Sequence, residues 1–288
     1  MTVVVKIGGA RAVDPAGALA DVADLVADGE SVVVVHGGST AVDETLERLG
    51  IEPEYVETPA GVVGRFTDAE TMDVFEMVFG RLNTELVVGL QNAGVDAIGL
   101  NGADGKLLAG PRKSAVRVVE DGKRKIRRGD HSGTIESVNA DLLRGVLADG
   151  YTPVVGPPML AAEGDEDDRR WLAVNTDADR AAAAIAGALG ATLVVLTDVP
   201  GILADPDDPA TLIEQVATPE ELDALADVAE GFMRRKVMAA TEALDGGAAE
   251  VVVADANADD PIRAALDGHG THLLPGAVEA PPEGDAPS

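Results

Sequence analysis

The sequence predicts an α/β protein, a three-layer αβα sandwich with a mostly parallel and open central sheet. Short Val-rich segments alternate along the chain with longer Ala- and Leu-rich segments whose apolar residues recur at helical spacing. Strands that are almost wholly apolar are typical of a parallel sheet that helices cover on both faces. With 288 residues and 46% hydrophobic content, the chain is long enough to bury such a core.

Five segments have the length and composition of buried strands: 3–7, 32–35, 153–155, 193–197 and 251–254. The segment between the first two predicts a helix, because Asp14 can cap it and Pro15 suits the first helical position. A second helix start is indicated at Thr218, where Glu221 completes a capping box.

Three further segments define the expected organisation of the chain. Residues 113–128 alternate polar and apolar positions around a Gly-containing turn, which predicts a β-hairpin. We expect a lobe boundary in the charged segment 160–171, which we interpret as a loop, so that the lobes are residues 1–170 and 171–275. The Pro-rich and acidic segment 276–288 has no periodicity and is expected to be a disordered tail.

Composition excludes several classes of function. The chain has no Cys, which rules out disulfides, thiolate metal sites and Cys nucleophiles. A net charge of −29 disfavours nucleic acid and anionic membranes as partners, and it suits a halophilic cytoplasm whose salt screens self-repulsion. No apolar run reaches the ~18 residues of a membrane span, and the N-terminus lacks the pattern of a signal peptide, so we expect a cytoplasmic protein.

Two Gly-Gly turns follow the first two strands and indicate an anion site. Gly8 and Gly9 follow the strand that ends near Lys6, and Gly37 and Gly38 follow the second strand. Since ligands of open α/β sheets bind outside the carboxyl ends of the strands, we expect both turns to contribute to one site. His36, directly before the second turn, is a candidate either for a structural hydrogen bond or for a catalytic base.

Two helix starts in the second half of the chain contain polar residues that suit the same site. NTDAD at 175–179 places Asn175 and Asp179 on one face of an Ala-rich helix, while Asp177 is expected to compensate the helix dipole. GFMRRK at 231–236 places Lys236 near a positive helix end, where phosphate oxygens bind readily.

Six motifs in order resemble the amino acid kinase family over about residues 2–275. They are KIGG at 6–9, HGG at 36–38, GRFTD at 64–68, NTDAD at 175–179, LTDVPG at 196–201 and GFMRRK at 231–236. The resemblance implies the amino acid kinase fold, with residues 1–170 as the lobe that binds the acyl-amino-acid and the carrier, and 171–275 as the nucleotide lobe. It also implies a homodimer.

The resemblance implies a role for individual residues. Phosphoryl transfer would be assisted by Lys6 and Lys236, with Asp179 holding both in place. The residues implied in binding the acyl-amino-acid end of the substrate are Gly37, Gly38, Arg65 and Asn175. The residues implied in binding ATP are Gly8, Gly9, Thr197, Asp198 and Gly201. The chemistry agrees with the composition, since a carboxylate acceptor is ionised at neutral pH and needs no general base, whereas positive charge and Mg²⁺ are needed.

Two details favour the branch whose substrate is linked to a small acidic amino-group carrier protein of the LysW type. N-acetylglutamate kinases usually have Asn where this chain has Asp177, and RRGDHSG with its basic hairpin is similar to the carrier-linked subgroup. The implied activity is ATP-dependent phosphorylation of the side-chain carboxylate of glutamate or 2-aminoadipate, in arginine or lysine biosynthesis. These acceptors differ by one methylene, so the choice stays open. The alternatives are a kinase for free N-acetylglutamate, a different acid or phosphate kinase on the same fold, and a non-catalytic sensor of nucleotide or amino acid.

The basic hairpin is the proposed docking site of the carrier. Residues 106–128 hold nine of the 22 Lys and Arg, and five of them are consecutive or nearly so: Lys123, Arg124, Lys125, Arg127 and Arg128. An acidic carrier would match this charge, whereas a small free amino acid does not require it. Alternation predicts that Arg124 and Arg128 point to one side and Arg127 to the other. The alternative is a solvated hairpin without a partner.

Overall fold

The computed structural model describes residues 1–8, 15–59, 61, 63–120, 123–164, 168–205, 208–229 and 231–278. The expected helix cap Asp14 lies outside these residues. Within them, no helix is both long and apolar enough to cross a membrane.

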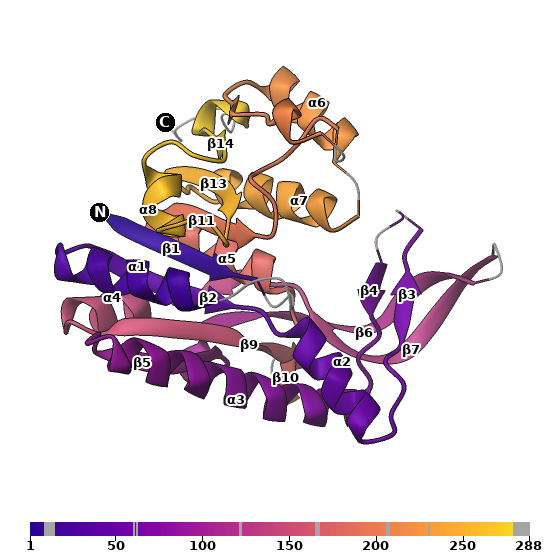
Figure 1. Ribbon diagram of the computed structural model, residues 1–288. Helices are drawn as coiled ribbons and strands as arrows, with labels where there is room; N and C mark the ends of the chain where they lie inside the picture. The colour runs from indigo at the N-terminus through magenta and orange to yellow at the C-terminus, as the bar shows by residue number, and fades with distance from the viewer. Residues whose placement is uncertain are drawn as a thin grey trace, which may run out of the picture.

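The five predicted strands are present and lie together in the sheet (Figure 1). They are β1 (Thr2–Ile7), β2 (Ser31–His36), β9 (Thr152–Glu163), β11 (Thr192–Thr197) and β13 (Glu250–Asp255). Seven strands extend it: β5 (Ala97–Gly102), β6 (Leu108–Glu120), β7 (Lys123–Gly133), β8 (Ser137–Val138), β10 (Arg170–Val174), β12 (Gln215–Val216) and β14 (Thr271–Leu273). The main order is β12-β14-β13-β11-β1-β2-β9-β6-β7, mostly parallel, which confirms the predicted fold class.

Helices cover both faces of the sheet. Those on one face are α1 (Pro15–Ala27), α3 (Ala69–Asn92) and α8 (Pro261–Leu266), and those on the other are α4 (Ala140–Ala148), α5 (Ala178–Leu189), α6 (Pro219–Val228) and α7 (Gly231–Asp245). A further helix, α2 (Ser39–Arg48), packs on the first half of α3. Helix α6 begins with the predicted capping box, in which Thr218 and Glu221 each accept from the other's backbone N–H.

Alternation along β1 decides which layer each side chain enters. Val3 and Val5 belong to the core under α1 and α8, whereas Val4 belongs to the core under α5 and α7. Because strand side chains alternate with a period of two, Lys6 shares the face of Val4. Lys6 is therefore directed to the layer that contains α5 and α7.

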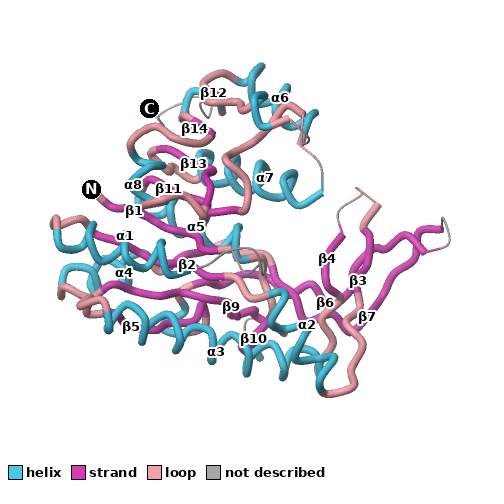
Figure 2. The backbone as a smooth tube through the Cα atoms, in the orientation of Figure 1, coloured by secondary structure: helices cyan, strands magenta, loops and turns pink. Residues whose placement is uncertain are grey.

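Two hairpins project from one end of the sheet beside α2 (Figure 2). The longer is the predicted hairpin, in which β6 pairs antiparallel with β7 from Glu120↔Lys123 down to Arg112↔Gly133. The shorter pairs β3 (Tyr55–Glu57) with β4 (Val63–Arg65) and was not predicted.

The structure differs from the expected loop at 160–171. This segment contains the end of β9 and the start of β10, which pair antiparallel from Arg170↔Glu163 to Val174↔Met159. Since β1 also pairs with β11, the sheet is continuous through both expected lobes. At the C-terminus, Pro275–Ala277 form a 3₁₀ turn with Ala277 buried, and residues 279–288 of the expected tail lie outside the described chain.

Candidate active site

Three charged side chains from separate elements meet at the carboxyl end of β1. Lys6 Nζ lies 2.5 Å from Asp179 Oδ1, and Lys236 Nζ lies 3.6 Å from Asp179 Oδ2. Lys6 comes from β1, Asp179 from the first turn of α5 and Lys236 from α7. All three side chains are largely buried. The structure thus brings together the residues that the resemblance implicated in phosphoryl transfer.

Burial and charge act in opposite directions on these groups. Burial favours the neutral form of Asp179, yet Lys6 and Lys236 reverse that effect and lower its pKa to about 2. Burial also lowers the pKa of Lys236, and the charge of Lys6 lowers it further. One ionised carboxylate therefore lies between two cationic side chains, which leaves net positive charge for an anionic ligand.

Asp177 was expected to compensate the helix dipole, and the structure makes it the N-cap of α5. Its Oδ1 accepts from the backbone N–H groups of Asp179 (2.8 Å) and Arg180 (3.2 Å), which fixes the first turn of α5. Its Oδ2 lies 3.8 Å from Arg235 Nη1, so it also connects α5 with α7. This carboxylate holds the helices that supply Asp179 and Lys236.

The residues implied in ATP binding follow β1 and β11. Gly8 ends the described part of the first turn, and Gly9 lies outside the described residues. Thr197 is buried at the end of β11, and its hydroxyl donates to Asp198 (3.2 Å). Gly201 is packed against Leu212 and Thr271, where an added Cβ would come within 2.6 Å of Leu212. These residues lie at the same sheet edge as Lys6, since β11 pairs in parallel with β1.

Arg65, at the end of β4, contacts the N-terminus of α2, the helix that directly follows the second Gly-Gly turn. Its guanidinium pairs with Asp43 (2.5 Å) and donates to the carbonyl oxygen of Ser39 (3.0 Å) and to the Tyr55 hydroxyl (3.0 Å). Gly38 caps this helix, and an added Cβ there would come within 2.6 Å of Leu82. Gly37 N–H donates to Ile7 O, so the second turn adjoins the end of β1.

Asn175 precedes α5 and is joined to the base of the basic hairpin. Its backbone N–H donates to His131 O (2.8 Å), and Gly133 N–H donates to Asn175 O (2.9 Å). The five residues from Asn175 to Asp179 thus lead from the hairpin base to the charged group at Lys6. The predicted acyl-binding and phosphoryl-binding residues therefore lie on connected segments.

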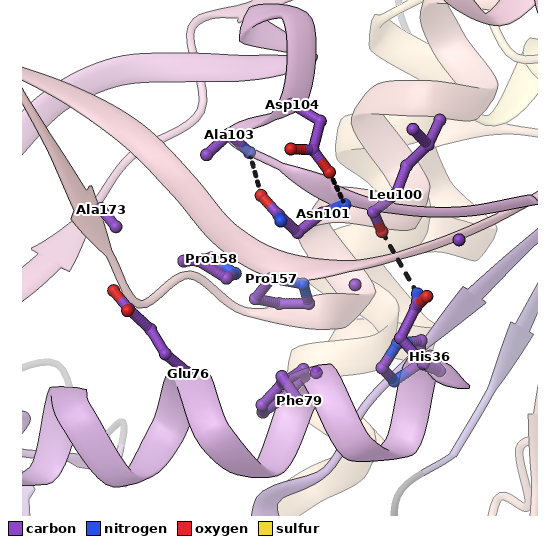
Figure 3. Close-up of a pocket in the computed structure, with 14 residues that line it drawn as sticks. His36, Glu76, Phe79, Leu100, Asn101, Ala103, Asp104, Pro157, Pro158 and Ala173 are labelled. Carbon is purple, nitrogen blue, oxygen red and sulfur yellow. Dashed lines mark hydrogen bonds between the residues drawn. The ribbon is translucent and has the colours of Figure 1, made fainter. Parts of the chain in front are cut away.

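His36 is buried and neutral rather than placed as a base beside Lys6. Burial lowers the pKa of His36 to about 4. Its ring stacks on Phe79 at 5.6 Å, and its Nε2 lies 3.3 Å from Asn83 Nδ2. His36 also lines a cavity of about 460 Å³ between α3, β5 and β9 (Figure 3). His36 is the one lining residue that had been a candidate for catalysis, and the residues implicated in substrate, ATP and phosphoryl binding do not line this cavity.

The basic hairpin presents two different faces. Arg127 points toward the β3–β4 hairpin, where it pairs with Glu54 (2.7 Å) and lies over the Phe66 ring at 4.9 Å. Arg124 and Arg128 are exposed on the opposite face, which agrees with the predicted alternation. Between them lies Ile126, which is 63% exposed. Lys123 and Lys125 are exposed on the Arg127 face.

Residues 1–255, which include all three residues of this charged group, match the amino acid kinase family. The chain belongs to this family. Its similarity to known members extends over nearly its full length, which confirms the resemblance drawn from the six motifs. The charged group of Lys6, Asp179 and Lys236 is therefore the candidate active site of a kinase.

This amino acid kinase is 45% identical over 273 residues to LysW-aminoadipate kinase of Thermus thermophilus, covering 93% of this chain and 98% of that protein. It is 39% identical over 272 residues to acetylglutamate kinase of Methanopyrus kandleri, covering 93% and 98%. Among solved structures it resembles N-acetylglutamate synthase from Neisseria gonorrhoeae with a TM-score of 0.74 and 26% identity. That match covers 97% of this chain and 60% of the longer synthase.

Several residues around the site were not predicted from the sequence. They are Ser39, Asp43, Tyr55, Thr67 and Asp130. Only Thr67 and Asp130 stand inside segments that had been singled out, GRFTD and RRGDHSG. The partners of Arg65 are separated from it by 10 to 26 positions, and no periodic pattern in a single sequence marks such contacts.

Proposed function

We propose that this amino acid kinase transfers the γ-phosphoryl group of ATP to the side-chain carboxylate of an amino acid, glutamate or 2-aminoadipate, that is linked to a small acidic carrier protein of the LysW type. The product is an acyl phosphate in arginine or lysine biosynthesis. The single observation that supports phosphoryl transfer most directly is the contact of Lys6 and Lys236 with the same carboxylate, Asp179. The name of the Thermus relative supports the carrier-linked acceptor.

The proposed chemistry requires charge and positioning rather than proton transfer. A carboxylate oxygen of the acceptor bonds to the γ-phosphorus as the bond to the β,γ-bridging oxygen breaks, and ADP leaves. The acceptor is already ionised, because a side-chain carboxylate has a pKa of ~4.3. Lys6 and Lys236 lie where they can neutralise charge on the transferring group, and Asp179 keeps the two ammonium groups in place.

Mg²⁺ is part of the proposal as a cation that arrives with ATP. It usually keeps several waters and binds through one or two carboxylates plus the phosphates of the nucleotide. The described residues contain no group of three or more His, Cys, Asp or Glu that could hold a metal by themselves, which fits a cation bound mainly by phosphate. When bound, Mg²⁺ would add positive charge on the β- and γ-phosphates, and Asp198 beside Thr197 is the carboxylate we propose to face it.

The exposed hairpin face supports a protein as the acceptor's carrier. Arg124 and Arg128 can form bidentate contacts with carboxylates, and Ile126 between them offers an apolar contact. Both arginines lie on a projecting element beside the segments that hold Asn175 and Arg65. We propose that this face orients an acidic carrier so that its terminal amino acid reaches those residues. Lys123 and Lys125 add positive charge at the hairpin tip.

The second candidate is a kinase for free N-acetylglutamate, favoured by the 39% identity to acetylglutamate kinase of Methanopyrus kandleri. A non-catalytic sensor is a third candidate, which the contact of Lys6 and Lys236 with Asp179 disfavours. An assay of ADP release separates the three. We expect turnover with carrier-linked glutamate or aminoadipate, and little turnover with N-acetylglutamate or without acceptor. Turnover with N-acetylglutamate alone would support the second candidate. No turnover with any acceptor would support the sensor.

We also propose a cytoplasmic, halophilic homodimer. The net charge of −29 favours folding in high salt, where the screening length falls to ~3 Å at 1 M.

The surface proposed for dimer formation lies on α3. Met77 and Val88 are 60% and 49% exposed there, on the face directed away from the sheet, and they offer an apolar surface for a second copy. Light scattering in 2 M KCl tests this assembly, and a Met77→Glu, Val88→Glu variant is expected to be monomeric. A parent that is already monomeric contradicts it.

A further inference from the structure

A buried hydrogen-bonded group joins the base of the basic hairpin to the acyl-binding residues. Asp130 is 1% exposed, and its Oδ1 accepts from the backbone N–H of Thr67 (3.1 Å). Its Oδ2 accepts from the hydroxyl of Ser132. Arg112 donates to the backbone carbonyl oxygen of Asp130 (3.2 Å), so both the carboxylate and the backbone of this residue are held. Asp130 therefore fixes the position of Thr67, two residues after Arg65.

Thr67 in turn contacts Asn175. It is fully buried, and its Oγ1 accepts from Asn175 Nδ2 at 2.9 Å. Its carbonyl oxygen accepts from His131 N–H at 2.7 Å. The hydroxyl thus takes one of the two N–H donors of the Asn175 amide, which fixes the amide plane and leaves the amide oxygen and the second N–H for other partners.

The sequence position of these residues makes the link specific. In sequence, Thr67 stands between Arg65 at the end of β4 and the start of α3, and Arg65 contacts the N-terminus of α2. Asp130 stands near the end of β7. A hydrogen bond between two neutral side chains, here buried Thr67 and partly buried Asn175, contributes only ~1 kcal/mol to stability. Its larger consequence is orientation, because a free Asn amide can rotate about its last side-chain bond.

We propose that Thr67, itself fixed by Asp130, is a positioning residue that orients the Asn175 amide for the acceptor and thereby links the carrier-docking hairpin to the acyl site. The inference rests on the proposed function, in which Asn175 binds the acyl-amino-acid. It assigns no contact with substrate to Thr67 or Asp130. Both act through Asn175.

A double-mutant cycle between Thr67 and Asn175 tests this positioning. Thr67→Val removes the hydroxyl with almost no change in volume, and Thr67→Ser keeps it. We expect Thr67→Val to raise the acceptor KM at least about fivefold, with the ATP KM unchanged, and Thr67→Ser to stay close to the parent. In the Asn175→Ala background, Thr67→Val is expected to change the acceptor KM less than about twofold, because the amide it orients is gone.

Two outcomes overturn the positioning role. One is a full additional loss from Thr67→Val in the Asn175→Ala background, since an effect on packing alone would add to that of Asn175→Ala. The other is a Thr67→Val acceptor KM equal to the parent's. Melting temperatures of all four variants, compared in the same salt, identify any that fail to fold, and Thr67→Ser then supplies the comparison with a hydroxyl retained.

A spectroscopic measurement separates failure of this inference from failure of the proposed function. The side-chain amide signals of Asn175 are identified by ¹⁵N NMR from their loss in Asn175→Ala. Without any acceptor, Thr67→Val is expected to shift these signals and Thr67→Ser to preserve them; unchanged signals in Thr67→Val contradict the inference. A parent enzyme inactive with every carrier-linked acceptor contradicts the proposed function alone, because the NMR result does not depend on turnover.

Discussion

Lys6 Nζ and Asp179 Oδ1 lie 2.5 Å apart, and this ion pair joins the end of β1 to the first turn of α5. Lys236 approaches the other oxygen of the same carboxylate from α7. Three elements that are distant in sequence thus hold two ammonium groups at one point of the sheet edge.

Lys236→Ala is expected to lower the turnover number far more than it raises the acceptor KM. The lysine is largely buried beside Asp179, and in the proposed mechanism its charge stabilises the transferring phosphoryl group. Removal of one such stabilising group typically lowers kcat about 10²- to 10³-fold. Steady-state kinetics with Arg234→Ala as the matched control on the exposed side of α7 measures the effect. Equal turnover in Lys236→Ala and the parent contradicts the assignment of this site.

Asp179→Asn is expected to destabilise the protein, on the order of 3 kcal/mol, because it leaves two buried ammonium groups without a counter-charge. The folded-state pKa of Asp179 is about 2, below its unfolded value of ~3.9, so its contribution is complete above pH ~3.9 and is lost only as the pH falls toward 2. Urea unfolding at pH 7 and at pH 5 should therefore show the same loss. A loss confined to one of the two pH values disagrees with this ionisation.

Protonation of His36 is expected to lower the free energy of unfolding in mild acid. Its folded-state pKa of about 4 lies below the unfolded value of ~6.5, so the unfolded chain binds more protons between these values and stability falls as the pH drops through that window. The full effect is about 3 kcal/mol. His36→Gln should flatten the dependence of the urea midpoint on pH between 6.5 and 4, whereas His269→Gln at an exposed position should not. An identical slope in His36→Gln and the parent would show that another group is responsible.

Gly156→Ala is expected to destabilise the fold by about 1–3 kcal/mol, because the added Cβ would lie 2.4 Å from His36 Nε2 and displace the ring. Gly145→Ala in α4 is the matched control, since nothing lies within 4 Å of its added Cβ and alanine favours a helix by about 0.5–1 kcal/mol. Thermal unfolding of both variants measures the difference. A Gly156→Ala protein as stable as the control contradicts the close packing at His36.

The exposed hairpin face that carries Arg124 and Arg128 should respond to mutation differently from exposed charges elsewhere on the surface. The double variant Arg124→Ser, Arg128→Ser removes two exposed charges. If each forms an ion pair with the carrier that contributes about 0.5–1 kcal/mol to binding, the KM for a carrier-linked acceptor should rise about 5- to 30-fold. The KM for ATP should not change. Arg48→Ser with Arg144→Ser removes the same charge from α2 and α4 and serves as the control. Equal effects of both pairs would assign the result to net charge rather than to docking.

Much of this fold could be predicted because its central strands are short Val runs. Residues 3–7, 32–35, 193–197 and 251–254 are buried on both faces, so their composition alone identifies them. Strand β10 was missed because it follows an acidic stretch of sequence and its first two residues, Arg170 and Trp171, are exposed. Its pairing with β9 depends on contacts that local sequence does not encode.

The site shows a similar division. The motifs identified Lys6, Asp179 and Lys236, but only the fold brings their atoms together. The neighbours of Arg65 and the Asp130–Thr67–Asn175 contacts depend on how β4, β7 and α5 meet, and none has a spacing that a single sequence reveals. The neutral state of His36 likewise depends on its burial against Phe79 and Gly156.

The most direct test of the central claim is trapping of the product. The protein is incubated with ATP, Mg²⁺, hydroxylamine and a carrier protein bearing glutamate or 2-aminoadipate, and the intact carrier is then analysed by mass spectrometry. An acyl phosphate reacts with hydroxylamine to give a hydroxamate, so we predict an ATP-dependent hydroxamate on the terminal side chain of the carrier, absent with Lys236→Ala. An unmodified carrier, under conditions where free N-acetylglutamate forms a hydroxamate, contradicts the proposed acceptor.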